Sequence, residues 1–226
     1  MPRGESMGPD DTREKRAAVK IDRDAVQWSA PERERAGRPL LVLLHGYGSH
    51  EGDLFGLSPM LPLEPVIASV RAPISESGGY AWFSRQDSAT GDPDPERVDP
   101  VASALIDWLD EQEYSSVGLL GFSQGAAVAL QLVRHAPTRF AATVALSGFV
   151  TRGPHAGDAE LEIAQPPVFW GYGTADPVIP QFAIERLREW LPGHSTSTIR
   201  VYEDLAHGIS PAELADFSRF LREHLK

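Results

Sequence analysis

A serine stands between two glycines in the stretch "GFSQG", residues 121–125. An apolar run precedes it and an alanine-rich run follows it, so Ser123 falls where a buried strand gives way to a helix. Glycines two residues before and after a serine allow a sharp strand-to-helix turn, and the helix N-terminus directs free N–H groups toward the hydroxyl. The pattern predicts a nucleophile at Ser123. The alternative is an ordinary turn on which Ser123 is the N-cap of the helix.

A seryl hydroxyl needs a base, and the sequence holds seven histidines. His207, in "YEDLAHGIS", follows an apolar run and precedes the last helical pattern, which places it at the same edge of a parallel sheet as Ser123. His194 precedes that apolar run and is expected at the opposite edge. His207 is therefore the predicted base, although a histidine on a surface loop would give the same pattern.

The base in turn needs a carboxylate that holds its tautomer and stabilises the imidazolium. Asp176, in "GTADPVIP", follows the apolar run at 167–172. Asp204 follows the run at 197–202 and lies three residues before His207. Both aspartates remain candidates at this point, and a turn-forming role for Asp176 is a further alternative.

Acyl transfer also needs N–H donors for the oxyanion of its transition state. The stretch "LLHGYGS", residues 43–49, follows the first strong apolar run, and Gly46 and Gly48 allow the backbone to approach a ligand closely. We expect the backbone N–H of Tyr47 to be one donor and the backbone N–H of Gln124 to be the other. An ordinary turn is the alternative for this stretch.

An alternation of strands and helices would bring these residues together. Continuous apolar runs predict buried strands at 40–44, 65–71, 116–122, 140–147, 167–172 and 197–202. Helical patterns lie between or after them, at 101–112, 123–137, 180–193 and 210–225. Such alternation predicts an α/β fold in which a mostly parallel sheet carries helices on both faces within a single domain. Ligands bind at the carboxyl ends of parallel strands, where the loops with the candidate residues are expected to meet.

The rest of the chain is expected to frame this domain. Residues 1–16 are charged and rich in turn-forming types, so we expect a disordered tail there, followed by one domain over residues 17–226. The two long connections, 72–97 and 148–165, hold no amphipathic helical pattern. They predict a site without a large lid and a preference for short to medium acyl groups.

Composition excludes several other classes of function. The 226 residues carry a net charge of −11, from 32 acidic and 21 basic side chains. This charge argues against nucleic-acid binding and against stable membrane association. The sequence has no cysteine, which excludes thiolate nucleophiles and thiolate metal sites and fits a reducing cytoplasm. We expect no signal peptide, and no apolar run approaches the roughly 20 residues of a membrane span.

The stretches "HGYGS", "GFSQGAAVAL", "ALSGF", "GTADPVIP" and "AHGIS" together resemble the carboxylesterase/phospholipase group of α/β-hydrolases, which includes the acyl-protein thioesterases and lysophospholipases. The similarity covers roughly residues 38–226. It implies the α/β-hydrolase fold and a serine hydrolase that acts on a small-molecule ester, thioester or lysophospholipid through an acyl-enzyme on Ser123, without metal or cofactor. The order of serine, acid and histidine, each after a successive strand, matches that fold and favours Asp176 over Asp204.

The resemblance also implies that Trp82 lines the acyl side of the site. Phe83 and Phe149 are further candidates for apolar walls, and the alternative for Trp82 and Phe83 is burial in the core. Ala126 stands where the family often has glycine, and Tyr172 where it often has histidine, which leaves the substrate open. An acyltransferase or perhydrolase with the same triad is the alternative function, as is a non-catalytic binding protein on this fold. A homodimer is left open.

Overall fold

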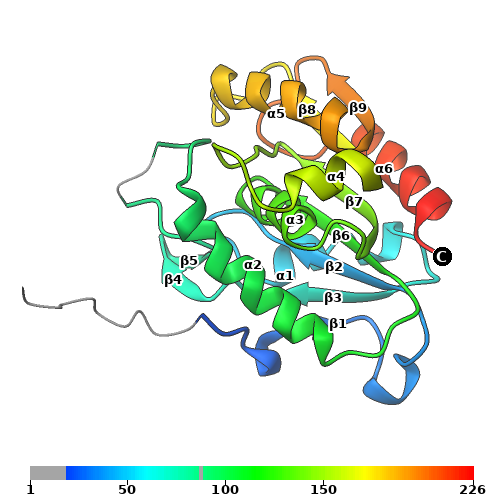
Figure 1. Ribbon diagram of the computed structural model, residues 1–226. Helices are drawn as coiled ribbons and strands as arrows, with labels where there is room; N and C mark the ends of the chain where they lie inside the picture. The colour runs from blue at the N-terminus through cyan, green and yellow to red at the C-terminus, as the bar shows by residue number, and fades with distance from the viewer. Residues whose placement is uncertain (1–18, 87–88) are drawn as a thin grey trace, which may run out of the picture.

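The computed structural model describes residues 19–86 and 89–226, so the tail expected at residues 1–16 lies outside the described residues. A seven-stranded sheet forms the centre of the molecule (Figure 1). Its strands are β1 (Gln27–Trp28), β2 (Leu40–Leu44), β3 (Val66–Val70), β6 (Val117–Phe122), β7 (Phe140–Leu146), β8 (Pro167–Gly173) and β9 (Thr196–Tyr202). They lie in the order β1-β3-β2-β6-β7-β8-β9, with β1 antiparallel to β3 and all other neighbours parallel.

The six predicted strands are confirmed as β2, β3, β6, β7, β8 and β9. Every residue of β2 and of β3 is buried, as expected for strands that are covered on both faces. Because these six strands run parallel, their carboxyl ends meet at one edge of the sheet. The loops that follow β2, β6, β8 and β9 carry the candidate site residues, so the topology alone gathers these loops at this edge.

Helices cover both faces of the sheet. They are α1 (Gly52–Phe55), α2 (Pro95–Asp110), α3 (Gln124–His135), α4 (Asp158–Ala164), α5 (Gln181–His194) and α6 (Pro211–His224). Apolar side chains of α2, α3, α4 and α5 form the larger core cluster on one face, and Figure 1 shows α2, α3 and α4 in front of the sheet. Side chains of α1 and α6 pack into a second cluster on the other face.

The ends of the predicted helices agree with the structure in part. The last helix begins as expected, with the Ser210 hydroxyl accepting the backbone N–H of Glu213 at 3.1 Å. The helix predicted at 180–193 is α5 (Gln181–His194), which holds Pro192 in its last turn. Proline within a helix removes one N–H donor, and its ring crowds the carbonyl group of the residue four positions earlier.

The two long connections contain structure that was not predicted. The hairpin formed by β4 (Ile74–Glu76) and β5 (Gly79–Ala81) lies within the first long connection. Its two-residue loop, Ser77-Gly78, has φ values of 58° and 79°, as a type I′ turn requires. The second long connection contains the short helix α4, and the expectation of a site without a large lid stays a prediction. Seven residues with a single buried apolar side chain, Leu161, are too few for a helical period to stand out.

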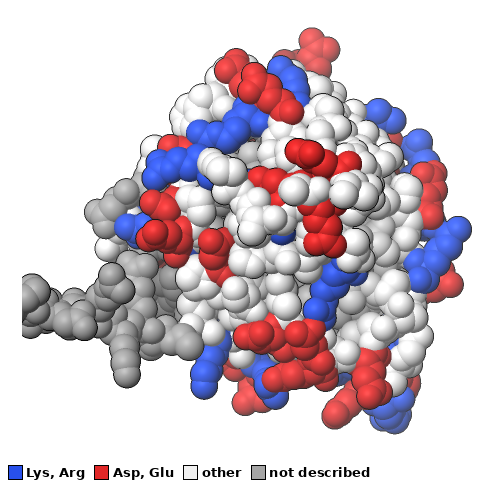
Figure 2. Space-filling model, viewed as in Figure 1, with Lys and Arg blue, Asp and Glu red and all other residues white. Residues whose placement is uncertain are grey.

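Charged side chains of both signs lie across the face of the molecule that Figure 2 draws. Figure 2 shows acidic side chains distributed over the viewed face, with lysine and arginine side chains between them. Within residues 19–86 and 89–226, no helix is both long enough and apolar enough to cross a membrane.

Candidate active site

Ser123 occupies a strained turn between β6 and α3. Its φ of 55° and ψ of −114° lie in a region that non-glycine residues rarely adopt. Although Ser123 stands at the N-cap position, its hydroxyl makes no capping hydrogen bond with α3. The interpretation of Ser123 as an ordinary N-cap is therefore wrong, and its hydroxyl is available for another partner.

The two flanking glycines are required by close packing. A Cβ added to Gly121 would lie 2.4 Å from the carbonyl oxygen of Gly125. A Cβ added to Gly125 would lie 2.0 Å from the carbonyl oxygen of Leu44, at the end of β2. Both distances are shorter than any real contact of a Cβ atom, so only glycine lets α3 start this close to the ends of β2 and β6.

The hydroxyl of Ser123 faces an imidazole. The Oγ atom lies 3.0 Å from Nε2 of His207, and Nδ1 of His207 lies 2.7 Å from Oδ2 of Asp176. The other carboxylate oxygen of Asp176 accepts the backbone N–H groups of Val178 and Ile179 at 2.8 and 3.2 Å. Because a carboxylate only accepts, Nδ1 of His207 carries a proton and Nε2 presents its lone pair to the Ser123 hydroxyl.

The electrostatics of Asp176 suit this arrangement. Burial acts to raise the pKa of its carboxyl group, but hydrogen bonds from His207, Val178 and Ile179 outweigh burial and hold this pKa below its usual value. The Asp176 side chain is 2% exposed and the His207 side chain 19%, so the acid is shielded while the imidazole reaches solvent. Phe122 packs against the His207 ring with a centroid distance of 4.8 Å, which further restricts the imidazole.

The rival residues lie elsewhere. His194 ends α5, where its Nδ1 lies 2.7 Å from the carbonyl oxygen of Trp190 and its ring stacks on that indole. Asp204 is exposed, and its backbone N–H donates to the Thr174 hydroxyl at 3.0 Å. The structure therefore brings together Ser123, His207 and Asp176, and leaves His194 and Asp204 outside this group.

The expected oxyanion donors lie on segments that flank Ser123. A Cβ added to Gly46 would lie 3.2 Å from the Phe122 ring and 3.7 Å from Cβ of Ser123, so the segment after β2 runs directly against the nucleophile turn. Gln124 is the first residue of α3, and the first N–H groups of a helix have no partner within the helix. Tyr47 follows Gly46 directly, which keeps its backbone N–H as a candidate donor.

The unexpected hairpin supports this segment. The backbone N–H of Gly48 donates to the Tyr80 carbonyl at 2.9 Å, and the N–H of Tyr80 donates to the Ser49 carbonyl at 2.8 Å. The Tyr47 hydroxyl donates to Glu76 of β4 at 2.8 Å. The "SGG" triplet before an aromatic residue was the sequence feature that could have indicated the hairpin.

The three aromatic residues expected to line the substrate site are buried. Trp82, Phe83 and Phe149 all belong to the larger core cluster. Their role as walls of an acyl site stays a prediction, and for Trp82 and Phe83 the alternative of core packing describes their position here. Sequence reasoning missed His45, which is fully buried between β2 and Gly46. A histidine that directly continues an apolar strand was the available indication.

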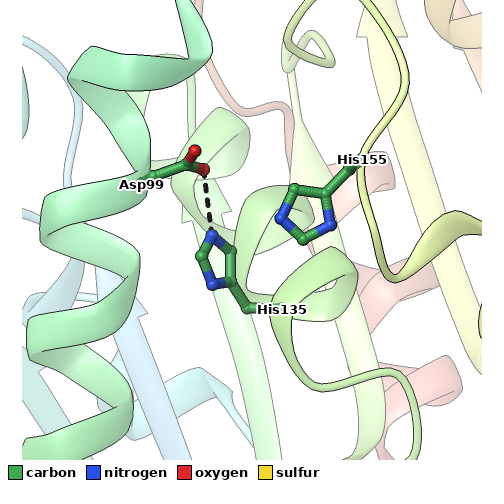
Figure 3. Close-up of side chains that lie close together, drawn as sticks. All are labelled: Asp99, His135 and His155. Atoms are coloured by element: carbon green, nitrogen blue, oxygen red, sulfur yellow. Dashed lines mark hydrogen bonds and ion pairs between the residues drawn. The ribbon is translucent and has the colours of Figure 1, made fainter.

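A second group of polar side chains lies far from Ser123. Figure 3 shows Asp99, His135 and His155, whose possible metal-ligating atoms all lie within 4.8 Å of one another. Asp99 accepts hydrogen bonds from Nε2 of His135 at 2.9 Å and from Gln131 at 2.6 Å. Nδ1 of His155 accepts the N–H of Gly157 at 3.0 Å, so the neutral ring carries its proton on Nε2. A metal would need the lone pair of that nitrogen, and we assign no metal to this group.

Comparison with known proteins places the chain among esterases. The model of the phospholipase/carboxylesterase family matches residues 29–225. Acyl-protein thioesterase 1 of Kluyveromyces lactis is 29% identical over 210 residues, covering 83% of this chain and 92% of the relative. Esterase YpfH of Escherichia coli is 27% identical over 208 residues, covering 85% and 84%. The carboxylesterase of Bacillus cereus superposes with a TM-score of 0.74 over 88% of this chain and 93% of that chain at 24% identity, a likeness of fold.

Proposed function

Because the chain belongs to the phospholipase/carboxylesterase family of α/β-hydrolases, we propose that it cleaves carboxylic esters and thioesters through an acyl-enzyme on Ser123. The protein is a hydrolase of the esterase class. The observation that carries the proposal is the continuous hydrogen-bonded chain from the Ser123 hydroxyl through His207 to Asp176. Its members lie 84 and 31 residues apart in the sequence, so local chain geometry alone does not account for the arrangement.

Acylation follows from this geometry. Nε2 of His207 takes the proton of the Ser123 hydroxyl as Oγ attacks the carbonyl carbon. The carbonyl oxygen becomes an oxyanion, which the backbone N–H groups of Tyr47 and Gln124 stabilise. As the tetrahedral intermediate collapses, the imidazolium gives its proton to the leaving alcohol or thiol. The negative charge of Asp176 stabilises the imidazolium throughout.

Deacylation uses the same groups with water as the acceptor. His207 takes a proton from water as the water oxygen attacks the acyl-enzyme carbonyl, and the oxyanion forms again at the same donors. Collapse of this second intermediate releases the carboxylic acid and returns the proton to Oγ of Ser123. The cycle closes with the serine, the imidazole and the carboxylate in their original protonation states.

The names of relatives support an acyl ester or thioester as substrate, since they include acyl-protein thioesterase 1 and esterase. We keep a small-molecule ester of short to medium chain length as the proposed substrate class. Equal activity on p-nitrophenyl esters and on matched acyl-thiocholines would place thioesters within the range. Location in the cytoplasm and assembly as a homodimer also remain proposals, to be tested by cell fractionation and by light scattering of the purified protein.

The test of this function is a serine substitution with a matched control. We expect Ser123→Ala to lower kcat/KM for p-nitrophenyl butyrate by roughly 10⁴- to 10⁶-fold and to abolish labelling by a fluorophosphonate probe. Ser147 directly follows the neighbouring strand β7 and is also a buried serine with a positive φ of 45°, so Ser147→Ala is the control and should be labelled fully. Retained activity in pure Ser123→Ala protein would overturn the proposal.

A further inference from the structure

The side chain of Gln124 uses both ends of its amide on one neighbouring segment. Oε1 accepts the backbone N–H of Trp82 at 2.8 Å, and Nε2 donates to the carbonyl oxygen of Phe83 at 2.7 Å. Gln124 is buried, so water does not compete for either bond. The residue that follows the nucleophile therefore fixes the backbone of two consecutive residues more than 40 positions earlier in the chain.

The indole of Trp82 connects the segment held by Gln124 to the segment that follows β2. Its Nε1–H donates to the carbonyl oxygen of His45 at 2.8 Å, and its ring lies against the His45 ring with a centroid distance of 5.3 Å. Trp82 is 1% exposed. The carbonyl that it holds belongs to the residue directly before Gly46 and Tyr47, so the bond acts one residue away from the segment expected to donate to the oxyanion.

The side chain of His45 also holds the segment after β2, through hydrogen bonds of both ring nitrogens. Nε2 of His45 accepts the backbone N–H of Ala72 at 3.1 Å, and Nδ1 lies 2.8 Å from the carbonyl oxygen of Gly46. A ring nitrogen that accepts an N–H leaves the proton on Nδ1, which then donates to Gly46. Burial lowers the pKa of His45, so the ring stays neutral and keeps this pair of bonds.

We propose that Gln124 and Trp82 are positioning residues that set the separation of the two oxyanion donors. The connection runs from the Gln124 side chain through Trp82 to the His45 carbonyl, and it links the start of α3 with the segment of Tyr47. Oxyanion donors stabilise a transition state only when they lie about 2.7–3.1 Å from the developing charge, so a fixed separation has a direct effect on rate. This inference rests on the proposed function, because it concerns the oxyanion of an acyl transfer.

Each alternative role of Trp82 predicts a different effect of truncating its side chain. If Trp82 is a wall of the acyl site, its truncation acts on substrate binding, and the effect grows with the length of the acyl chain. If Trp82 positions the donors, truncation acts on the transition state, and kcat falls by the same factor for every acyl chain. If Trp82 only fills the core, stability falls without a specific loss of transition-state binding.

The test is Trp82→Phe, which keeps most of the apolar ring and removes the indole N–H. Trp170→Phe is the matched control, because Trp170 is also fully buried and its indole N–H has no partner among the described residues. We expect Trp82→Phe to lower kcat roughly 5- to 50-fold with KM unchanged, which is less than the roughly 10²–10³-fold loss on removing an oxyanion donor. A trifluoromethyl ketone, which forms an oxyanion on Ser123, should bind more weakly by the same factor. Trp170→Phe should change neither quantity.

Several outcomes would overturn the inference. These are an unchanged kcat in folded Trp82→Phe, a loss confined to KM, or a loss that grows from acetyl to octanoyl esters. Should Trp82→Phe not fold, Gln124→Met is the second variant, since it matches glutamine in length, keeps the backbone N–H and lacks both side-chain bonds. A wild-type protein without esterase activity and without labelling of Ser123 would instead overturn the proposed function, so the two failures are distinguishable.

Discussion

Asp176 receives three hydrogen bonds, and only one of them comes from the imidazole. The two backbone N–H donors, from Val178 and Ile179, fix the plane of the carboxylate independently of His207. The pKa of Asp176 lies below its usual value, so the group stays ionised throughout the neutral range. The turn after β8 thus holds the carboxylate in one orientation, and the carboxylate in turn holds the histidine in one tautomer.

These hydrogen bonds predict that replacing the Asp176 carboxylate by an amide lowers kcat strongly. Asp176→Asn preserves the shape of the side chain, but its amide cannot accept at both oxygen positions, and it presents an N–H group to Nδ1. We expect kcat to fall about 10³- to 10⁴-fold because the histidine then adopts the wrong tautomer. Asp204→Asn is the control and should keep its activity, since the Asp204 side chain is exposed and its backbone N–H bonds to Thr174. A larger loss in Asp204→Asn would return the role of the acid to that residue.

Whether a strand or helix could be predicted from the sequence depended on how much of it is buried. The strands β2 and β3 were predictable because they are buried along their whole length and therefore read as continuous apolar runs. The hairpin of β4 and β5 has three residues per strand and is only partly buried, so no clear alternation marks it. The short helix α4 was not predicted for the same reason, since Leu161 is its only buried residue.

The same contrast holds for the residues of the site. The grouping of Ser123, Asp176 and His207 was predictable because each lies in a loop or turn that follows a strand at the carboxyl edge of the sheet. The tertiary role of the Gln124 side chain was not, since its partners Trp82 and Phe83 lie in a segment whose path depends on the unexpected hairpin. A hydrogen bond between distant segments leaves no periodic pattern in the sequence.

Helix α6 contains a carboxyl group whose environment predicts a pH-dependent stability. The side chain of Glu213 is buried against Gly171, and neither carboxyl oxygen has a partner among the described residues. Burial raises the pKa of Glu213 to about 7, from about 4.5 in an exposed carboxyl. The folded state therefore holds a proton that the unfolded state releases, and stability falls as the pH rises from about 4.5 to about 7.

Glu213→Gln removes this titration while preserving the shape of the side chain. Relative to wild type, we expect the variant to gain roughly 2–4 kcal/mol in the free energy of unfolding between pH 5 and pH 8, since each pKa unit corresponds to about 1.4 kcal/mol. The measurement is urea unfolding at both pH values. Glu223→Gln, an exposed position on the same helix, is the control and should follow wild type. If the free energies of unfolding of wild type and Glu213→Gln change equally between pH 5 and pH 8, the raised pKa of Glu213 is contradicted.

The parallel order of the strands gathers the candidate site residues from distant parts of the chain. The loops after β2, β6, β8 and β9 are spread over more than half of the sequence, yet the sheet places all of them at one edge. Helix α3 has 12 residues, so the group of Asp99, His135 and His155 lies roughly 17 Å from the start of that helix, outside the catalytic edge. The proposed catalytic residues thus lie together at one edge of the sheet, whereas the core clusters extend along both of its faces.

The N-terminal limit of that core is testable by truncation. The first described residues already contribute, because Val19 and Ile21 pack, partly buried, against the larger core cluster. Removal of residues 1–16 leaves both side chains in place, so we expect an unchanged melting temperature and unchanged kcat/KM. Removal of residues 1–22 deletes both, and the loss of their buried apolar area should cost roughly 1–3 kcal/mol.

For a domain of this size, such a loss lowers the melting temperature by about 2–4 °C for each kcal/mol. Calorimetry of the two truncations beside the full chain measures the difference directly. Activity should survive in both, because the loops of the site follow strands β2, β6, β8 and β9 and none of them includes residues 1–22. A fall in melting temperature on removing only residues 1–16 would show that those residues also contribute to the folded domain, and the boundary placed at residue 17 would have to move toward the N-terminus.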